Sequence, residues 1–79
     1  MIKFDNLEKV CNELGLKVEN SYGYTNVFNK DNILFISLNP FKAWDCNFNL
    51  TFSYLEPSIK AMLIKAMARD YEEHLNGND

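Results

Sequence analysis

The side chains in this 79-residue chain that could do chemistry are one histidine, two cysteines and scattered carboxylates. Asp70 and His74 lie four positions apart, and on a helix that spacing would let the carboxylate orient the imidazole as a general base. No serine or cysteine nucleophile and no second histidine lies near them in the sequence. We therefore favour a structural role, in which His74 complements the negative end of a helix and pairs with Asp70.

The two cysteines, Cys11 and Cys46, do not form a recognisable site. Cys11 falls on an apolar stripe, which favours a buried core thiol over a nucleophile. Cys46 and His74 would need two more ligands to bind zinc, and neither a Cys-x-x-Cys nor a His-x-x-x-His spacing occurs. The two thiols could form a disulfide, but without a secretory signal we expect them to be reduced and buried. The sequence predicts a protein that is not an enzyme and that holds no metal or cofactor.

Aromatic side chains are more numerous than the core of so small a domain needs on one side of one sheet. On an open sheet face they would form an interaction surface. The alternative is that they fold over the ends of the sheet and complete the core. With polar residues of the third expected strand, the candidate interaction surface consists of Tyr22, Tyr24, Phe28, Trp44, Asn47, Asn49 and Thr51.

These side chains must be positioned by helices at both ends of the chain, the first of which is expected over about 6–14. Asp5 and Glu8 have the spacing of a capping box at its start. Gly15 can adopt the left-handed conformation that ends a helix in a Schellman motif, with Leu16 providing the hydrophobic contact. The apolar positions recur at intervals of three and four residues, as a helix that packs on one side requires: Leu7, Val10, Cys11 and Leu14.

The longest periodic segment runs from Pro57 to about Leu75 and predicts the principal helix of the domain. Proline is favoured in the first turn of a helix, which makes Glu56 the expected N-cap. Asn76-Gly77 supplies the stop signal, and residues 78–79 are expected to fray. The apolar face expected to cover the sheet comprises Ile59, Met62, Leu63, Ala66, Met67 and Tyr71.

Three strands are expected between the two helices. The first covers 17–29, where Gly23 suggests a bulge, a bend, or a loop before a shorter strand. A turn at 29–32 leads to a central strand at 33–38. Strict alternation of apolar and polar residues over 46–54 predicts a third strand, with one face on the core and one face in water.

The expected fold is therefore a single α+β domain over residues 1–79. Its element order is α-β-β-β-α, with a three-stranded antiparallel meander and both helices on one face of the sheet. The residues expected to be least exposed are Leu7, Val10, Leu14, Ile36, Phe48, Leu50, Ile59, Leu63, Ala66 and Met67.

The third expected strand would lie at an edge of this sheet. From 46 to 54 it contains no charged residue and no proline, which are the usual guards against edge-to-edge pairing. Such a segment is an aggregation hazard when it is left uncovered. We therefore expect a homodimer, or a complex with a partner that pairs with this edge.

Charge and hydropathy disfavour several classes of partner. The net charge is −3, and the eight lysines and arginines are scattered along the chain. This pattern argues against a nucleic-acid-binding groove, although aromatic side chains could still stack on single-stranded nucleic acid. No segment approaches the roughly 20 apolar residues that a membrane span needs, and the N-terminus lacks the apolar core of a signal peptide. We expect a cytoplasmic protein that does not associate with membranes.

Two resemblances bear on function. The element order is that of double-stranded-RNA-binding domains, but those present a lysine cluster at the start of the last helix, where 56–60 has a single lysine. The run 34–38, continuing through Phe41 and Asp45 to 55–63, is similar to small proteins encoded by phages and prophages of Gram-positive bacteria. The similarity covers nearly the whole chain, but the Thr-Pro- and Glu-Arg-rich segment that follows in many members is missing.

This resemblance implies an accessory phage protein in the cytoplasm of the bacterial host, with no particular activity. Together with the aromatic surface, it predicts a protein–protein interaction module that binds an unidentified host or phage protein and modulates a host factor. The alternative prediction is a nucleic-acid-binding domain that uses the open sheet face.

Overall fold

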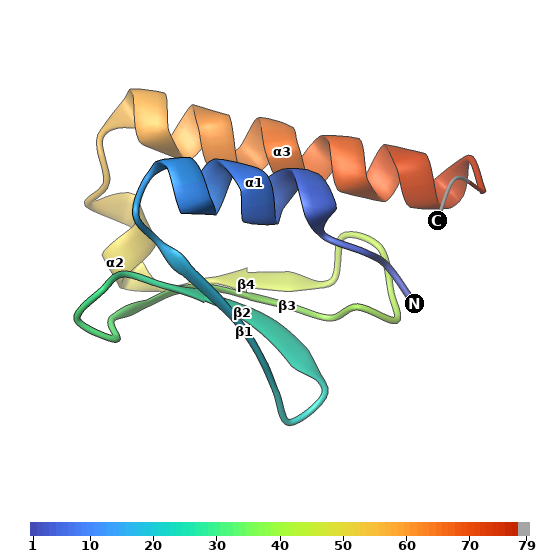
Figure 1. Cartoon of the computed structure of the whole chain (residues 1–79), viewed down its shortest axis with the longest axis horizontal. Helices are drawn as coiled ribbons and strands as arrows, with labels where there is room; N and C mark the ends of the chain where they lie inside the picture. The colour runs from blue at the N-terminus through green and yellow to red at the C-terminus, as the bar shows by residue number, and fades with distance from the viewer. Residues whose placement is uncertain (78–79) are drawn as a thin grey trace.

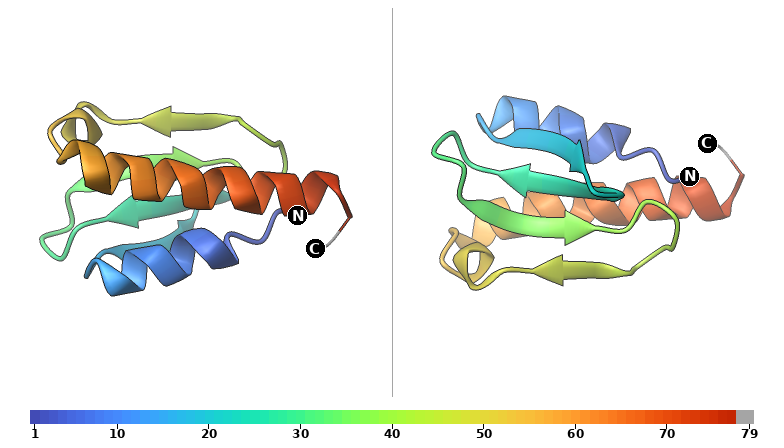
Figure 2. Two further views of the ribbon diagram at one scale, coloured as in Figure 1. Left: turned by 90° about the horizontal axis from the view of Figure 1, so that it is seen from above. Right: turned by 90° about the horizontal axis from the view of Figure 1, so that it is seen from below.

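The computed structural model describes residues 1–77 and folds them into a helical layer on one face of a four-stranded antiparallel sheet (Figure 1). The strand order is β1-β2-β3-β4, so each strand pairs with its neighbour in the chain. The two long helices lie side by side on the same face of the sheet, which leaves the other face open (Figure 2). The elements are α1 (Asp5–Glu13), β1 (Lys17–Ser21), β2 (Tyr24–Phe28), β3 (Leu34–Leu38), β4 (Cys46–Phe48), α2 (Leu50–Ser53) and α3 (Pro57–Leu75).

The α+β class, with an antiparallel meander between two long helices, is confirmed. The predicted Schellman ending of α1 is present: Gly15 has a φ of +74°, and the Leu16 N–H donates to the Cys11 carbonyl at 2.8 Å. At the other end of the chain, α3 begins at Pro57 and ends at the predicted stop. The expected fraying of 78–79 lies outside the described residues.

The capping box predicted at the start of α1 is wrong. The helix begins at Asp5 itself, Phe4 occupies the N-cap position, and no side chain of the first turn caps it. The first-turn N–H groups of Asn6 and Leu7 instead donate to the carboxylate of Asp70, which lies on α3. A cap from a distant helix leaves no trace in the local sequence, and this explains the error.

The segment 17–29, expected as one strand, folds into two strands, so the sheet has four strands and not three. Tyr22 has a φ of 52° and Gly23 has a φ of +78°. Positive φ at both central residues defines a type I′ turn, whose twist matches that of the flanking strands. The chain therefore reverses at Gly23, and Ser21 pairs with Tyr24.

The strand predicted over 46–54 is also wrong beyond Phe48. Phe48, opposite Ile36 of β3, is the last paired residue of β4, and the chain then turns into the short helix α2. The Asn49 N–H donates to the Phe35 carbonyl at 2.9 Å, and the Thr51 hydroxyl donates to the Leu34 carbonyl. These bonds close the end of the sheet where a longer β4 would have continued.

The core lies between the sheet and the two long helices. Leu7 of α1, Ile36 of β3 and Leu63 of α3 are fully buried, as predicted. Phe48 and Leu50, which were also expected in the core, are 44% and 71% exposed: Phe48 lies on the edge strand β4, and Leu50 lies on α2 after the chain has left the strand. Two more predicted core residues, Ala66 and Met67, are buried, whereas Val10, Leu14 and Ile59 are half-buried against the core. Cys11 and Tyr71, which the sequence placed on apolar helix faces, are buried as expected, and the predicted list of least exposed residues also omitted Ile2, Phe4, Val27, Phe35, Leu38 and Phe52.

Candidate functional site

The carboxylate of Asp70 has a structural role at the contact between α1 and α3. Its Oδ1 accepts hydrogen bonds from the Asn6 N–H and the Asn6 Nδ2, and its Oδ2 accepts one from the Leu7 N–H, each at 2.9 Å. Burial raises the pKa of Asp70, and the hydrogen bonds from Leu7 and Asn6 oppose this rise. Both oxygens are therefore engaged in holding the first turn of α1 against α3.

The two cysteines are free thiols in different surroundings. Cys11 is fully buried, and burial together with the charge of Glu8 raises its pKa to about 12. Cys46 is half-buried; its burial and the nearby Asp45 raise its pKa, while the Tyr71 hydroxyl lowers it. A thiol becomes a good nucleophile as the thiolate, so both surroundings make these cysteines less reactive. Across residues 1–77, no three His, Cys, Asp or Glu side chains converge on a point where they could hold a metal ion.

The turn between β1 and β2 presents an aromatic side chain to solvent from an unfavourable backbone conformation. Tyr22 is 99% exposed, and its φ of 52° lies in the left-handed region. For a residue other than glycine that conformation costs about 1–2 kcal/mol. Asparagine, aspartate or glycine is the usual choice at this position of a type I′ turn. The tyrosine therefore lowers the stability of the turn and gains no burial in exchange.

A shallow depression of about 390 Å³ lies on the open face of the sheet beside this turn. Asn26 of β2 pairs with Ser37 of β3, which pairs with Asn47 of β4, so these three side chains form one row across the sheet. The Ser37 hydroxyl donates to the Asn26 Oδ1 at 2.8 Å, which fixes the middle of the row. We call the lining the tyrosine face, which consists of Ser21, Tyr22, Tyr24, Asn26, Ser37, Asp45, Cys46 and Asn47.

The tyrosine face contains three of the seven residues predicted from the sequence. Tyr22, Tyr24 and Asn47 line it together, and all three are exposed. Phe28 lies at the far end of β2, where it is half-buried and pairs with Leu34. Thus only part of the predicted surface forms a contiguous site.

The other three predicted residues have structural roles. Asn49 and Thr51 hydrogen-bond the Leu34 carbonyl at the opposite end of the sheet. Trp44 is 55% exposed, but its ring packs on Tyr71 with a centroid distance of 4.5 Å. Burial raises the pKa of the Tyr71 hydroxyl, which is buried without a hydrogen-bond partner of good geometry within residues 1–77, although the Cys46 thiol lies close to it. Trp44 therefore covers this part of the core.

Residues of the tyrosine face that the sequence analysis missed are Ser21, Asn26, Ser37, Asp45 and Cys46. Asn26 and Ser37 are polar residues next to buried Val27 and Ile36, and in a strand such neighbours point to opposite faces of the sheet. This alternation indicates which residues lie on the open face of the sheet, but it can be used only once 17–29 is recognised as two strands, β1 and β2. Asp45 is held by the Asn39 Nδ2, which donates to its Oδ2 at 3.0 Å.

Comparisons with known proteins add no relative to this picture. No family model, no curated protein and no solved structure matches the chain. Within residues 1–77, no helix combines the length and the apolar character that crossing a membrane requires.

Proposed function

We propose that this protein is a protein–protein interaction module that binds its partner through the tyrosine face. The observation that supports this most directly is the composition of that surface. Two tyrosines lie at one end of the surface, and next to them a row of asparagine and serine side chains crosses β2, β3 and β4. Antibody paratopes favour the same residue types, because tyrosine gives a large rigid contact and serine and asparagine give adaptable hydrogen bonds.

The conformation of Tyr22 supports the same proposal. Strained residues persist most often where they serve binding or catalysis. An aromatic ring that is 99% exposed contributes little to folding, whereas tyrosine is enriched among the residues that dominate binding energy at interfaces. A partner that covered the ring would bury apolar surface that the isolated domain leaves in water.

Nucleic-acid binding through the open face is the weaker candidate. The tyrosine face has one carboxylate, from Asp45, and no lysine or arginine. Phosphate binding would require cations there, and its affinity would fall steeply as salt is added. A titration from low to physiological salt separates the two candidates, because a polar protein interface without charge pairs responds weakly.

The resemblance to small phage and prophage proteins suggests the source of the partner. On this proposal the protein is an accessory factor that acts in the bacterial cytoplasm on a host or phage protein. A homodimer is a second form that the same surface could take, since an isologous interface needs only one self-complementary patch.

The experiment compares three baits in a lysate of a Gram-positive bacterium: the native protein, Tyr22→Ser with Tyr24→Ser, and Tyr54→Ser. Tyr54 is 78% exposed and lies outside the tyrosine face, so its replacement is the matched control. We expect a partner that is retained by the native protein and the control and lost by the double variant. Equal retention by all three baits would contradict the proposal, and sedimentation of each bait alone tests the homodimer.

A further inference from the structure

The outer edge of β1 carries backbone groups that no other strand uses. Ser21 and Tyr24 flank a two-residue turn, so they exchange backbone hydrogen bonds, and such bonded pairs alternate along an antiparallel ladder. Glu19 is therefore bonded to β2. Val18 and Asn20 instead direct their N–H and C=O groups away from the sheet, where β1 has no neighbouring strand among the described residues.

The two edges of the sheet differ in how well they are protected. Strand β4 has three residues and continues directly into α2, and a very short edge strand is a common guard against pairing. Strand β1 has five residues, pairs with β2 in regular register and contains no proline, and its charged residues are Lys17 and Glu19. The longer and more regular edge of the sheet is thus β1, not the segment 46–54.

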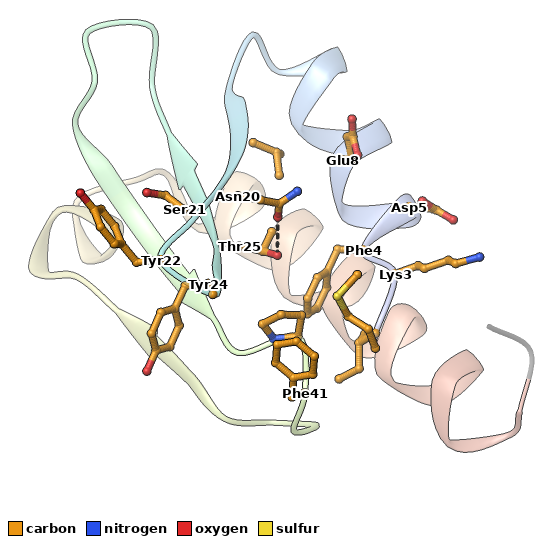
Figure 3. A pocket seen from close by; sticks show the side chains of 15 residues that line it. Lys3, Phe4, Asp5, Glu8, Asn20, Ser21, Tyr22, Tyr24, Thr25 and Phe41 are labelled. Atoms are coloured by element: carbon orange, nitrogen blue, oxygen red, sulfur yellow. Dashed lines mark hydrogen bonds between the residues drawn. The ribbon is translucent and has the colours of Figure 1, made fainter.

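A groove of about 440 Å³ runs between this edge and the N-terminal part of the chain (Figure 3). This volume lies within the range of about 300–1,000 Å³ that is usual for ligand sites. Phe4, Val18 and Thr25 contribute to its lining. The Thr25 hydroxyl donates to the Asn20 Oδ1 at 2.8 Å, and the Asn20 side chain lies between β1 and α1 in Figure 3. The groove adjoins the tyrosine face and shares Ser21, Tyr22 and Tyr24 with it, but the two tyrosine rings point away from the edge of β1 (Figure 3).

Charged side chains line the helical side of the groove. Asp5 and Glu8, both exposed, come from the first turns of α1, and Lys3 comes from the segment before it. The two carboxylates make the α1 side of the groove locally negative, because Lys3 and the amino terminus at Met1 lie on the segment before the helix. A partner with basic side chains is therefore the complementary one.

We propose that β1 binds an extended segment of a partner protein as an additional antiparallel strand. The N–H and C=O groups of Val18 and Asn20 pair with the backbone of that segment. Its side chains alternate, so that apolar residues enter the groove and basic residues approach Asp5 and Glu8. This mode of binding does not depend on the tyrosine face, although one partner can occupy both surfaces.

The test uses a labelled synthetic peptide of alternating lysine and valine, with a peptide of alternating glutamate and valine as its comparison. Asn20→Pro and Asn20→Ala both remove the side chain that Thr25 contacts, but only proline removes the outward N–H. Proline is tolerated at an edge position whose N–H faces solvent, so the pairing of β1 with β2 is retained. Fluorescence anisotropy at physiological salt measures the affinity of each variant, and amide exchange locates the bound strand.

We expect the lysine–valine peptide to bind the native protein and Asn20→Ala within about threefold of each other, and Asn20→Pro at least about tenfold more weakly. The Val18 and Asn20 amides of the native protein should become protected when the peptide binds. Equal affinities for the proline and alanine variants, absence of binding, or equal binding of the glutamate–valine peptide would each overturn the proposal. So would self-association of the native protein that Asn20→Pro abolishes, because a second copy would then occupy the edge. If the tyrosine double variant loses a lysate partner and Asn20→Pro retains it, the proposal for the tyrosine face stands. The proposal for the β1 edge is then wrong for that partner.

Discussion

The contact between α1 and α3 buries polar groups that hydrogen-bond one another. The turn between β1 and β2, in contrast, leaves a residue with a strained backbone exposed to solvent. At the helical contact, Asp70 has an exposed fraction of 0% and meets two backbone N–H groups that would otherwise lack a partner. The Asn6 side chain adds a further bond to the Glu73 Oε2 at 3.1 Å. At the turn, Tyr22 holds an unfavourable conformation and its ring contacts solvent.

This difference separates the parts of the molecule that maintain the fold from the part available for binding. At the contact between α1 and α3 the Asp70 carboxylate and the first-turn N–H groups satisfy one another, as a stable core requires, although the Tyr71 hydroxyl elsewhere on α3 is buried without a hydrogen-bond partner of good geometry among residues 1–77. The turn retains strain of about 1–2 kcal/mol, although asparagine at the same position would relieve most of it. Trp44, with a φ of 63°, is also strained, but its ring packs on Tyr71 and so contributes to the core.

The largest effect should come from the helical layer. Leu63→Ala removes a fully buried side chain and should lower the free energy of unfolding by about 2–5 kcal/mol, enough to unfold much of a small domain. Ile64→Ala, at the next position of α3 and 41% exposed, should cost under about 1 kcal/mol. Denaturant titration of both variants measures the difference. A loss below about half a kcal/mol at Leu63 would place this residue on the surface and remove the basis of the comparison.

The next effect concerns the cap that crosses between the helices. Asp70→Ala should cost about 2–4 kcal/mol, because the N–H groups of Asn6 and Leu7 would remain buried without an acceptor. Amide exchange at Leu7 should accelerate more than exchange at the centre of α3. Glu72→Ala, an exposed carboxylate on the same helix, serves as the control and should change stability by less than about half a kcal/mol. Equal effects of the two substitutions would show that the hydrogen bonds of Asp70 do not stabilise α1.

Local sequence signals predicted the two long helices and their ends well. Proline at the start of α3 and glycine after α1 set the helix boundaries through the conformation of the few residues around them, so these boundaries can be predicted from the sequence. The Asp70 cap could not be found in this way, because it joins residues that are 64 positions apart. In the sequence, Asp70 cannot be distinguished from an exposed polar residue of a helix, because the position of the helix that it caps is not known.

The strands were predicted less well, because a pattern of alternation does not say where pairing stops. The segment 46–54 alternates throughout, yet β4 ends at Phe48, and the chain turns into α2 with hydrogen bonds from Asn49 and Thr51 to carbonyls of β3. Gly23 was recognised as an interruption of 17–29, but a tyrosine before it concealed the type I′ turn, which usually contains asparagine or aspartate. Missing this turn also concealed the row of Asn26, Ser37 and Asn47 on the tyrosine face. Tyr22, Tyr24 and Asn47, which the sequence named as candidates for a surface, are exposed, whereas the sequence left open whether the aromatic residues would instead complete the core.

The smallest effect has the opposite sign and tests the turn directly. Tyr22→Asn should raise the free energy of unfolding by about 0.5–1 kcal/mol, because asparagine adopts the left-handed conformation with less strain. For a domain of this size the melting temperature should rise by roughly 2–8 °C. Tyr54→Asn, a surface tyrosine outside the tyrosine face, should leave the melting temperature nearly unchanged. If Tyr22→Asn instead destabilises the protein, the tyrosine ring makes stabilising contacts, and the turn then contributes to the stability of the fold as the contact between α1 and α3 does. If it stabilises the protein and also weakens binding of the captured partner, then the strain at this turn is retained for recognition.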